Sequence, residues 1–204
     1  IAANATLKLE GAGTHTLSTL AMGNNATLEL AANTSANITT AKAGTPTGTG
    51  TYPGARAGVR ELFGTDFTIK VGAGAELTDA GAWELSNGSD MTVSGGGVYH
   101  VAGVGLSMRD SNSTSLTIDT DTTLHITGTD TTGSKFGDSF SLGHWDPDNT
   151  VTVRGTLELE CGLSTSKNAA NEGNSYKGYT AINVESGGKL AFNNGLHASV
   201  SRRG

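Results

Sequence analysis

The feature that most constrains the fold of this chain is a short motif that returns along its length. The segment NATLKL at residues 4–9 returns as NATLEL at residues 25–30. A looser pattern follows, in which a short alternating apolar run, a turn of Gly or Asp and a second apolar run recur in units that begin at Phe67, Met91, Leu116, Val151 and Ile182. Each unit indicates two short β-strands joined by a turn. A repeat of about 20–25 residues with insertions of variable length is typical of a β-solenoid.

The composition agrees with an all-β fold and excludes other classes. Apolar residues make up 35% of the 204 residues, 30 residues are Gly, and no apolar run reaches the length of a membrane span. A helical bundle is disfavoured because Gly, Thr, Ser and Asn dominate, and the net charge of −6 argues against nucleic-acid binding. A sandwich or barrel would have turns at similar spacing, but it gives no reason for one turn sequence to return.

We therefore expect one β-helix segment over residues 1–204, with about 7–8 rungs, as part of a longer solenoid. Equivalent residues of successive rungs should form inward aliphatic rows, one of which is Ile69, Val93, Ile118, Val153 and Val184. We expect the first strand, within residues 1–9, to pair with another chain segment or with further solenoid rungs, because it begins directly in the repeat without a polar cap.

Four stretches break the repeat and are expected to be insertions that leave the coil. They are residues 41–66, 107–115, 130–149 and 164–180. The first contains the one short helical pattern, with Val59, Leu62 and Phe63 at positions i, i+3 and i+4. A short helix is therefore predicted there, lying over a face or an end of the solenoid.

The repeat also resembles a known family. The segments VESGGKLAFNNG at 184–195 and VGAGAEL at 71–77 resemble the repeats of bacterial autotransporter passenger domains. The resemblance covers most rung cores and none of the four insertions. It implies a right-handed parallel β-helix displayed outside the bacterial outer membrane, on the cell surface or secreted. It transfers no catalytic residues, and the segment itself should not insert into a membrane.

Candidate catalytic and metal-binding residues have an alternative interpretation as solvated surface. Glu158 and Glu160 lie two residues apart on one strand and should point outward together, at a separation that suits a glycosidase pair. Asp119 and Asp121 are expected to repeat this arrangement one rung earlier, which favours ordinary surface charge. The five histidines show no metal-ligand spacing along the chain, and the loop at 146–149 lacks the oxygen series of a calcium site. We expect no catalytic residues, no metal and no cofactor.

The aromatic residues indicate a candidate glycan-binding site. The side chains assigned to it lie in the two late insertions and are Phe136, Phe140, Trp145, Asp146, Tyr176 and Tyr179. Aromatic faces beside acidic and amide groups suit sugar rings and their hydroxyls. The alternative is that the rings bury one another in a small satellite core beneath the loops.

The function expected from the sequence is that of a non-catalytic extracellular scaffold or adhesin, which binds host or matrix glycans through its loops. One alternative is a polysaccharide-degrading β-helix enzyme, either a hydrolase or a lyase. Another is a structural fibre element. Thr-x-Thr pairs such as Thr14/Thr16 and Thr150/Thr152 do not fall at one point of every repeat, so an ice-binding surface is not expected.

Overall fold

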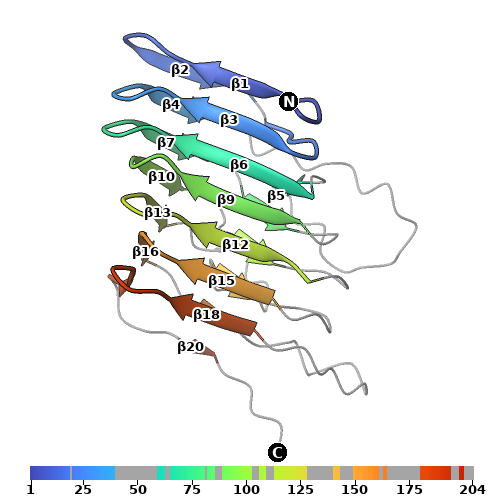
Figure 1. Cartoon of the computed structure of the whole chain (residues 1–204), viewed down its shortest axis with the longest axis vertical. Coiled ribbons are helices and arrows are strands. Elements are labelled where there is room, and N and C mark those ends of the chain that lie inside the picture. Colours follow the sequence, from blue (N-terminus) through green and yellow to red (C-terminus); the bar gives the residue numbers. More distant parts are fainter. Residues whose placement is uncertain are drawn as a thin grey trace, which may run out of the picture.

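The structure is a computed structural model of a stack of β-strand rungs. It describes residues 1–18, 20–39, 59–62, 65–80, 82–85, 89–102, 106–108, 113–127, 140–142, 149–160, 163–164, 180–193 and 198–199. Within these residues every element is a strand, and the strands of successive rungs lie side by side (Figure 1). In this described part of the chain, no helix is long and apolar enough to cross a membrane.

Three parallel sheets form the stack, and in the described residues the third begins at the second rung. Sheet A has seven strands: β1 (Thr6–Leu9), β3 (Ala26–Leu30), β6 (Asp66–Val71), β9 (Asp90–Ser94), β12 (Ser115–Ile118), β15 (Asn149–Val153) and β18 (Thr180–Val184). Sheet B also has seven: β2 (Thr14–Leu17), β4 (Ser35–Ile38), β7 (Glu76–Asp79), β10 (Val98–Val101), β13 (Thr123–Ile126), β16 (Thr156–Leu159) and β19 (Lys189–Phe192). Sheet C has six short strands: β5 (Val59–Leu62), β8 (Ala82–Leu85), β11 (Leu106–Met108), β14 (Phe140–Leu142), β17 (Leu163–Ser164) and β20 (Ala198–Ser199).

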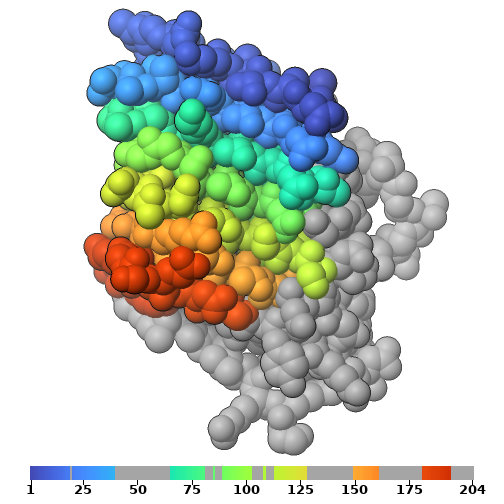
Figure 2. Space-filling model, in the orientation of Figure 1, coloured from blue at the N-terminus to red at the C-terminus, as the bar shows by residue number. Residues whose placement is uncertain are grey.

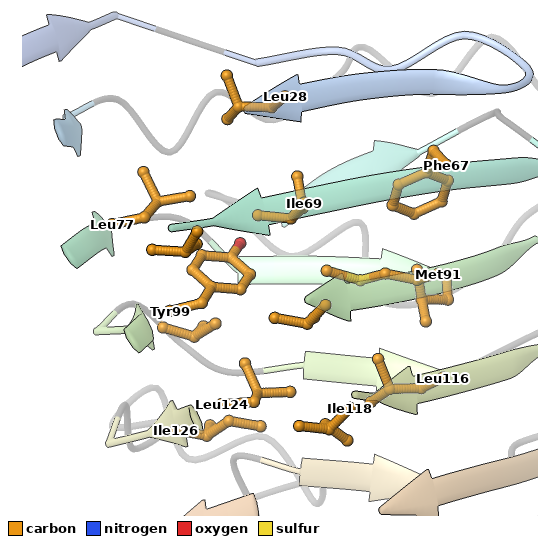
Figure 3. Packing of buried hydrophobic residues seen from close by; sticks show 14 of the residues in the cluster. Leu28, Phe67, Ile69, Leu77, Met91, Tyr99, Leu116, Ile118, Leu124 and Ile126 are labelled. Carbon is orange, nitrogen blue, oxygen red and sulfur yellow. The ribbon is translucent and has the colours of Figure 1, made fainter. Parts of the chain in front are cut away.

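The register confirms the predicted aliphatic row of sheet A. Ile69 pairs with Val93, Val93 with Ile118, Ile118 with Val153, and Val153 with Val184. The first four side chains of this row are fully buried. Of these, Ile69 and Ile118 face apolar residues of sheet B such as Leu77 and Leu124 (Figure 3). Parallel pairing in this register arranges equivalent side chains in the same row at about 4.8 Å spacing. The all-β prediction and the rung-by-rung stacking are therefore confirmed.

The corner between sheets A and B is short and uses residues in the left-handed backbone region. Asn33, Asp121 and Gly74 have φ angles of 59°, 60° and 69° at equivalent points of this corner. Asn, Asp and Gly tolerate this conformation better than other residues. These residues belong to the turns seen in the sequence repeat. The turn residues recur because the same corner between sheets A and B needs this conformation in successive rungs.

The predicted helix near residue 59 is wrong. Val59–Leu62 is strand β5, whose residues pair in parallel with β8, from Val59 with Ala82 to Leu62 with Leu85. A single helical turn is unstable without many further residues, whereas the edge of β8 offers backbone partners. Phe63 lies outside the described residues.

The third strand of each rung was not predicted from the sequence. Strands β5, β11 and β14 lie within, or begin next to, stretches expected to be insertions. At the end of the insertion expected at residues 130–149, Asn149 is buried in β15, where its side-chain oxygen accepts hydrogen bonds from the backbone and hydroxyl of Thr114 at 3.1 and 2.9 Å. This asparagine is part of the folded rung, which assigns its polar atoms a structural role.

Candidate functional site

Most of the predicted glycan site lies outside the described residues. This applies to Phe136, Trp145, Asp146, Tyr176 and Tyr179.

Phe140 is the one predicted site residue within a described strand. It begins β14 and pairs with Leu106 of β11 and Leu163 of β17. It therefore stands in an apolar register row of sheet C.

The described residues instead bring together a polar cluster on the outer face of sheet B. His100 of β10 pairs in register with His125 of β13, and their rings stack with centroids 4.7 Å apart and planes 14° apart. The Nε2 atom of His100 lies 2.8 Å from the hydroxyl oxygen of Thr127. The Nε2 atom of His125 lies 2.9 Å from a carboxylate oxygen of Glu160. We call His100, His125, Thr127 and Glu160 the histidine cluster.

The repeat places this cluster on the outside of the coil. Side chains alternate along each strand, so His100 lies between the inward residues Tyr99 and Val101, which are both fully buried. His125 likewise lies between the buried residues Leu124 and Ile126. The cluster is nevertheless only partly exposed, because each ring is covered by its neighbour in the next rung.

The electrostatics of the cluster disfavour a proton on His100. Burial, and next the positive charge of His125, hold the pKa of His100 below its ordinary value. Glu76 and Glu160 act in the opposite direction, because their negative charges favour the protonated ring. His100 therefore favours the neutral form, in which it can stack on His125 without a charge of its own.

Glu158 and Glu160 both point outward from β16 and its end, as predicted, but each carboxylate has a basic neighbour. Glu160 contacts His125 in the preceding rung, whereas Glu158 lies 3.8 Å from the ammonium group of Lys189 in the following rung. The two acids therefore turn toward opposite neighbours along the stack. This arrangement suits surface ion pairing between rungs.

The expected repetition of this pair by Asp119 and Asp121 is wrong. Both residues lie between β12 and β13, and Asp121 has a left-handed φ of 60° in the turn. The register partner of Glu158 one rung earlier is His125. Alternation of side chains holds along one strand and does not continue across a corner, so the spacing of the two aspartates is misleading.

The histidine cluster was missed because ligand spacing was sought along the chain. The signal lies in the repeat, since Tyr99-His100-Val101 and Leu124-His125-Ile126 occupy the same position in successive units. Residues one repeat apart become direct neighbours in a solenoid. Comparing outward positions between repeats would have predicted the pair.

Sheet A carries a second outward row that was also missed from the sequence. Six threonines occupy it in register: Thr6, Thr27, Thr68, Thr92, Thr117 and Thr152. Charged residues flank this row, with Lys8, Glu29 and Lys70 on one side and Asp66 and Asp90 on the other. β-Branched side chains pack well on a pleated strand. The row therefore has a structural explanation within the sheet.

Among the described residues, no group of three or more His, Cys, Asp or Glu side chains is arranged to hold a metal ion.

No protein-family model, curated protein or solved structure matches the chain. The similarity to autotransporter passengers therefore remains a prediction from the repeat residues.

Proposed function

We propose that this chain is a non-catalytic scaffold of a bacterial surface or secreted protein, built as a right-handed β-helix of the autotransporter passenger type. In this role the coil holds loops outside the cell, and the loops bind glycans of a host or matrix. The handedness is supported by the strong right-handed preference of connections between parallel strands of one sheet.

The observation that carries the proposal is the placement of the long connections. Residues 31–34, 72–75 and 119–122 make short corners between sheets A and B. The three longest connections, at residues 39–58, 127–139 and 165–179, all begin or end at a strand of sheet C. Two of them enter sheet C from sheet B and the third leaves sheet C for sheet A. A constant coil whose variable segments adjoin one sheet suits a rigid scaffold that carries binding loops.

The topology also supports a shared binding surface for part of the predicted glycan site. β14 and β17 are neighbouring parallel strands, so their C-terminal ends lie at the same side of sheet C. The connection that contains Trp145 and Asp146 starts from the first of these ends. The connection that contains Tyr176 and Tyr179 starts from the second. Phe136 precedes β14 and thus belongs to the opposite side.

The proposal includes pairing of the stack ends with further solenoid rungs. Leu7 and Val184 occupy the two ends of one register row, and their side chains are 37% and 47% exposed. Leu28, the register partner of Leu7 in the second rung, is fully buried. An added parallel rung would cover these apolar groups and use the open strand edges.

The test combines a glycan array with thermal unfolding of Trp145→Ala. We expect the variant to lose glycan binding while its main unfolding transition stays almost unchanged, because loops on a rigid coil contribute little to its stability. Trp83→Ala, which removes the chain's other tryptophan from β8, controls for the loss of an indole. A stability loss of about 3 kcal/mol or more in Trp145→Ala would instead indicate a satellite core.

Two further measurements separate this proposal from its alternatives. Release of sugar fragments from acidic or mucin-type polysaccharides, abolished by Glu158→Gln or Glu160→Gln, would replace the scaffold with a polysaccharide-degrading enzyme. End-to-end polymers in electron micrographs, without retention of any glycan, would favour a structural fibre. Failure of the wild-type chain to retain a glycan would contradict the binding role.

A further inference from the structure

The histidine cluster joins two adjacent rungs through groups whose charge depends on pH. His100 and His125 belong to different strands, and their stacked rings form a contact on the outer face between β10 and β13. Below them, Tyr99 and Leu124 are fully buried in the core. A change in the outer contact therefore acts on two rungs that are otherwise fixed by backbone pairing and apolar packing.

Charged groups of every neighbouring strand face or flank this contact. Glu76 lies on β7, and its charge acts on His100. Glu158 belongs to β16, in register with His125, and is paired with Lys189 of β19. Glu160 follows β16 and contacts His125 directly. The negative charge nearest to the stacked rings is therefore placed against His125 rather than His100.

One proton is accommodated easily by this arrangement, whereas a second proton is not. When His125 is protonated, it forms an ion pair with Glu160 across 2.9 Å. A second proton on His100 places two positive rings 4.7 Å apart. Partial burial limits the screening of this repulsion by water and salt. The hydroxyl of Thr127 beside His100 offers no negative charge to offset it.

We propose that His100 and His125 form a proton-operated latch, which is closed while at least one ring is neutral and is released when both are protonated. Release separates the two rings and loosens the outer contact between β10 and β13, while the backbone ladder keeps the rungs together. The latch does not depend on glycan binding. Loss of one property would leave the other unaffected.

The first test follows both rings by NMR titration between pH 4.5 and pH 8, a window spanning the ordinary histidine pKa of about 6.5. We expect His100 to titrate below its ordinary value in the wild-type chain. In His125→Gln the midpoint of His100 should move upward, because the neighbouring positive charge is gone. In Glu76→Gln, which leaves both rings in place, it should move further downward. A His100 midpoint that neither substitution moves would overturn the proposal.

The second test measures amide hydrogen exchange in β10 and β13 above and below the His100 midpoint, corrected for intrinsic exchange rates. We expect a several-fold acid-induced rise in wild type that is absent in His100→Gln. Thr78→Gln places the same side chain one strand away in the same outward row and should retain the rise. An equal rise in wild type and His100→Gln would show that the pair does not control the contact.

Discussion

Ile118 in the middle of the stack and Leu7 in its first rung occupy the same inward row of sheet A, yet their environments differ. The Ile118 side chain is fully buried between Val93 and Val153, whereas Leu7 is 37% exposed and has Leu28 on one side. Figure 2 shows the blue N-terminal band at one end of the stack, with a neighbouring band on one side, whereas the bands in the middle lie between two others. The inward position alone does not bury a side chain. A neighbour on each side along the axis completes its burial.

The largest difference between the two regions should come from truncating this row. Ile118→Ala should lower the free energy of unfolding by about 2–4 kcal/mol, and Val153→Ala by an amount near the lower end of that range. Leu7→Ala should cost about 1 kcal/mol, because less apolar area leaves water there. Chemical denaturation of the three variants gives these values. Unchanged unfolding of both central variants would mean that the row does not carry the core.

The next largest difference concerns glycines at the corner between sheets A and B. A Cβ atom at Gly97 would overlap the carbonyl oxygens of Gly72 and Ala75 in the preceding rung, so Gly97→Ala should cost about 3 kcal/mol. Gly187 in the last rung has open space around it and a φ of 86°. Gly187→Ala should therefore cost about 1 kcal/mol, from backbone strain alone. Thermal melts would rank the two, and the reverse order would contradict the assigned rung contacts.

The pH dependence of stability should also come from the middle of the stack. The pKa of His100 is lowered in the folded chain, so the unfolded chain binds this proton more readily. The contribution of His100 to the free energy of unfolding is therefore fully present above the pKa of the unfolded chain, about 6.5. It declines as the pH falls from there toward the lower pKa of the folded chain. Denaturation at pH 7.5 and pH 5 should show a smaller decline in His100→Gln than in wild type. Identical pH dependence in the two proteins would contradict this assignment.

The smallest effects should come from the ion pairs on the outer face of sheet A. Lys70 lies 3.4 Å from Glu29 between the second and third rungs, and Arg154, just after β15, lies 3.0 Å from Glu185, just after β18 in the last rung. Glu29→Gln and Glu185→Gln should each cost less than about 1 kcal/mol. The change at Glu29 should be the larger, because its side chain is 25% exposed against 49% for Glu185. Both effects should shrink in concentrated salt.

The rung core could be predicted from the sequence because the core obeys a local rule. Alternation within one strand and return of the same turn are enough to align Val93 with Ile118 and Val153, and the strand register agrees with that alignment. The strands of sheet C escaped this rule because they are short, from two to four residues, and follow connections of unequal length. Their pairing is stabilised by strands of the adjacent rungs, and the residues within each short strand do not by themselves predict that pairing.

The candidate site was harder to predict for the same reason. Glu160 and His125 meet only because the repeat brings residues from successive rungs together. Searching for ligand spacing within one segment overlooks contacts of this kind. For the aromatic residues of the late insertions, including Trp145 and Tyr176, the glycan-binding interpretation remains a prediction.

The uniform register has a consequence for how such a chain can change length during evolution. Suppose that recombination deleted the segment from Met91 to Thr150. Asp90 would then be followed directly by Val151, which would take the inward position in the strand that Met91 occupies now. Thr152 and Val153 would then follow at the places of Thr92 and Val93, and the outward and inward faces would be preserved. Unequal crossing-over between repeats could therefore remove or add whole rungs, changing the reach of the molecule along its axis while conserving the surfaces on its sides.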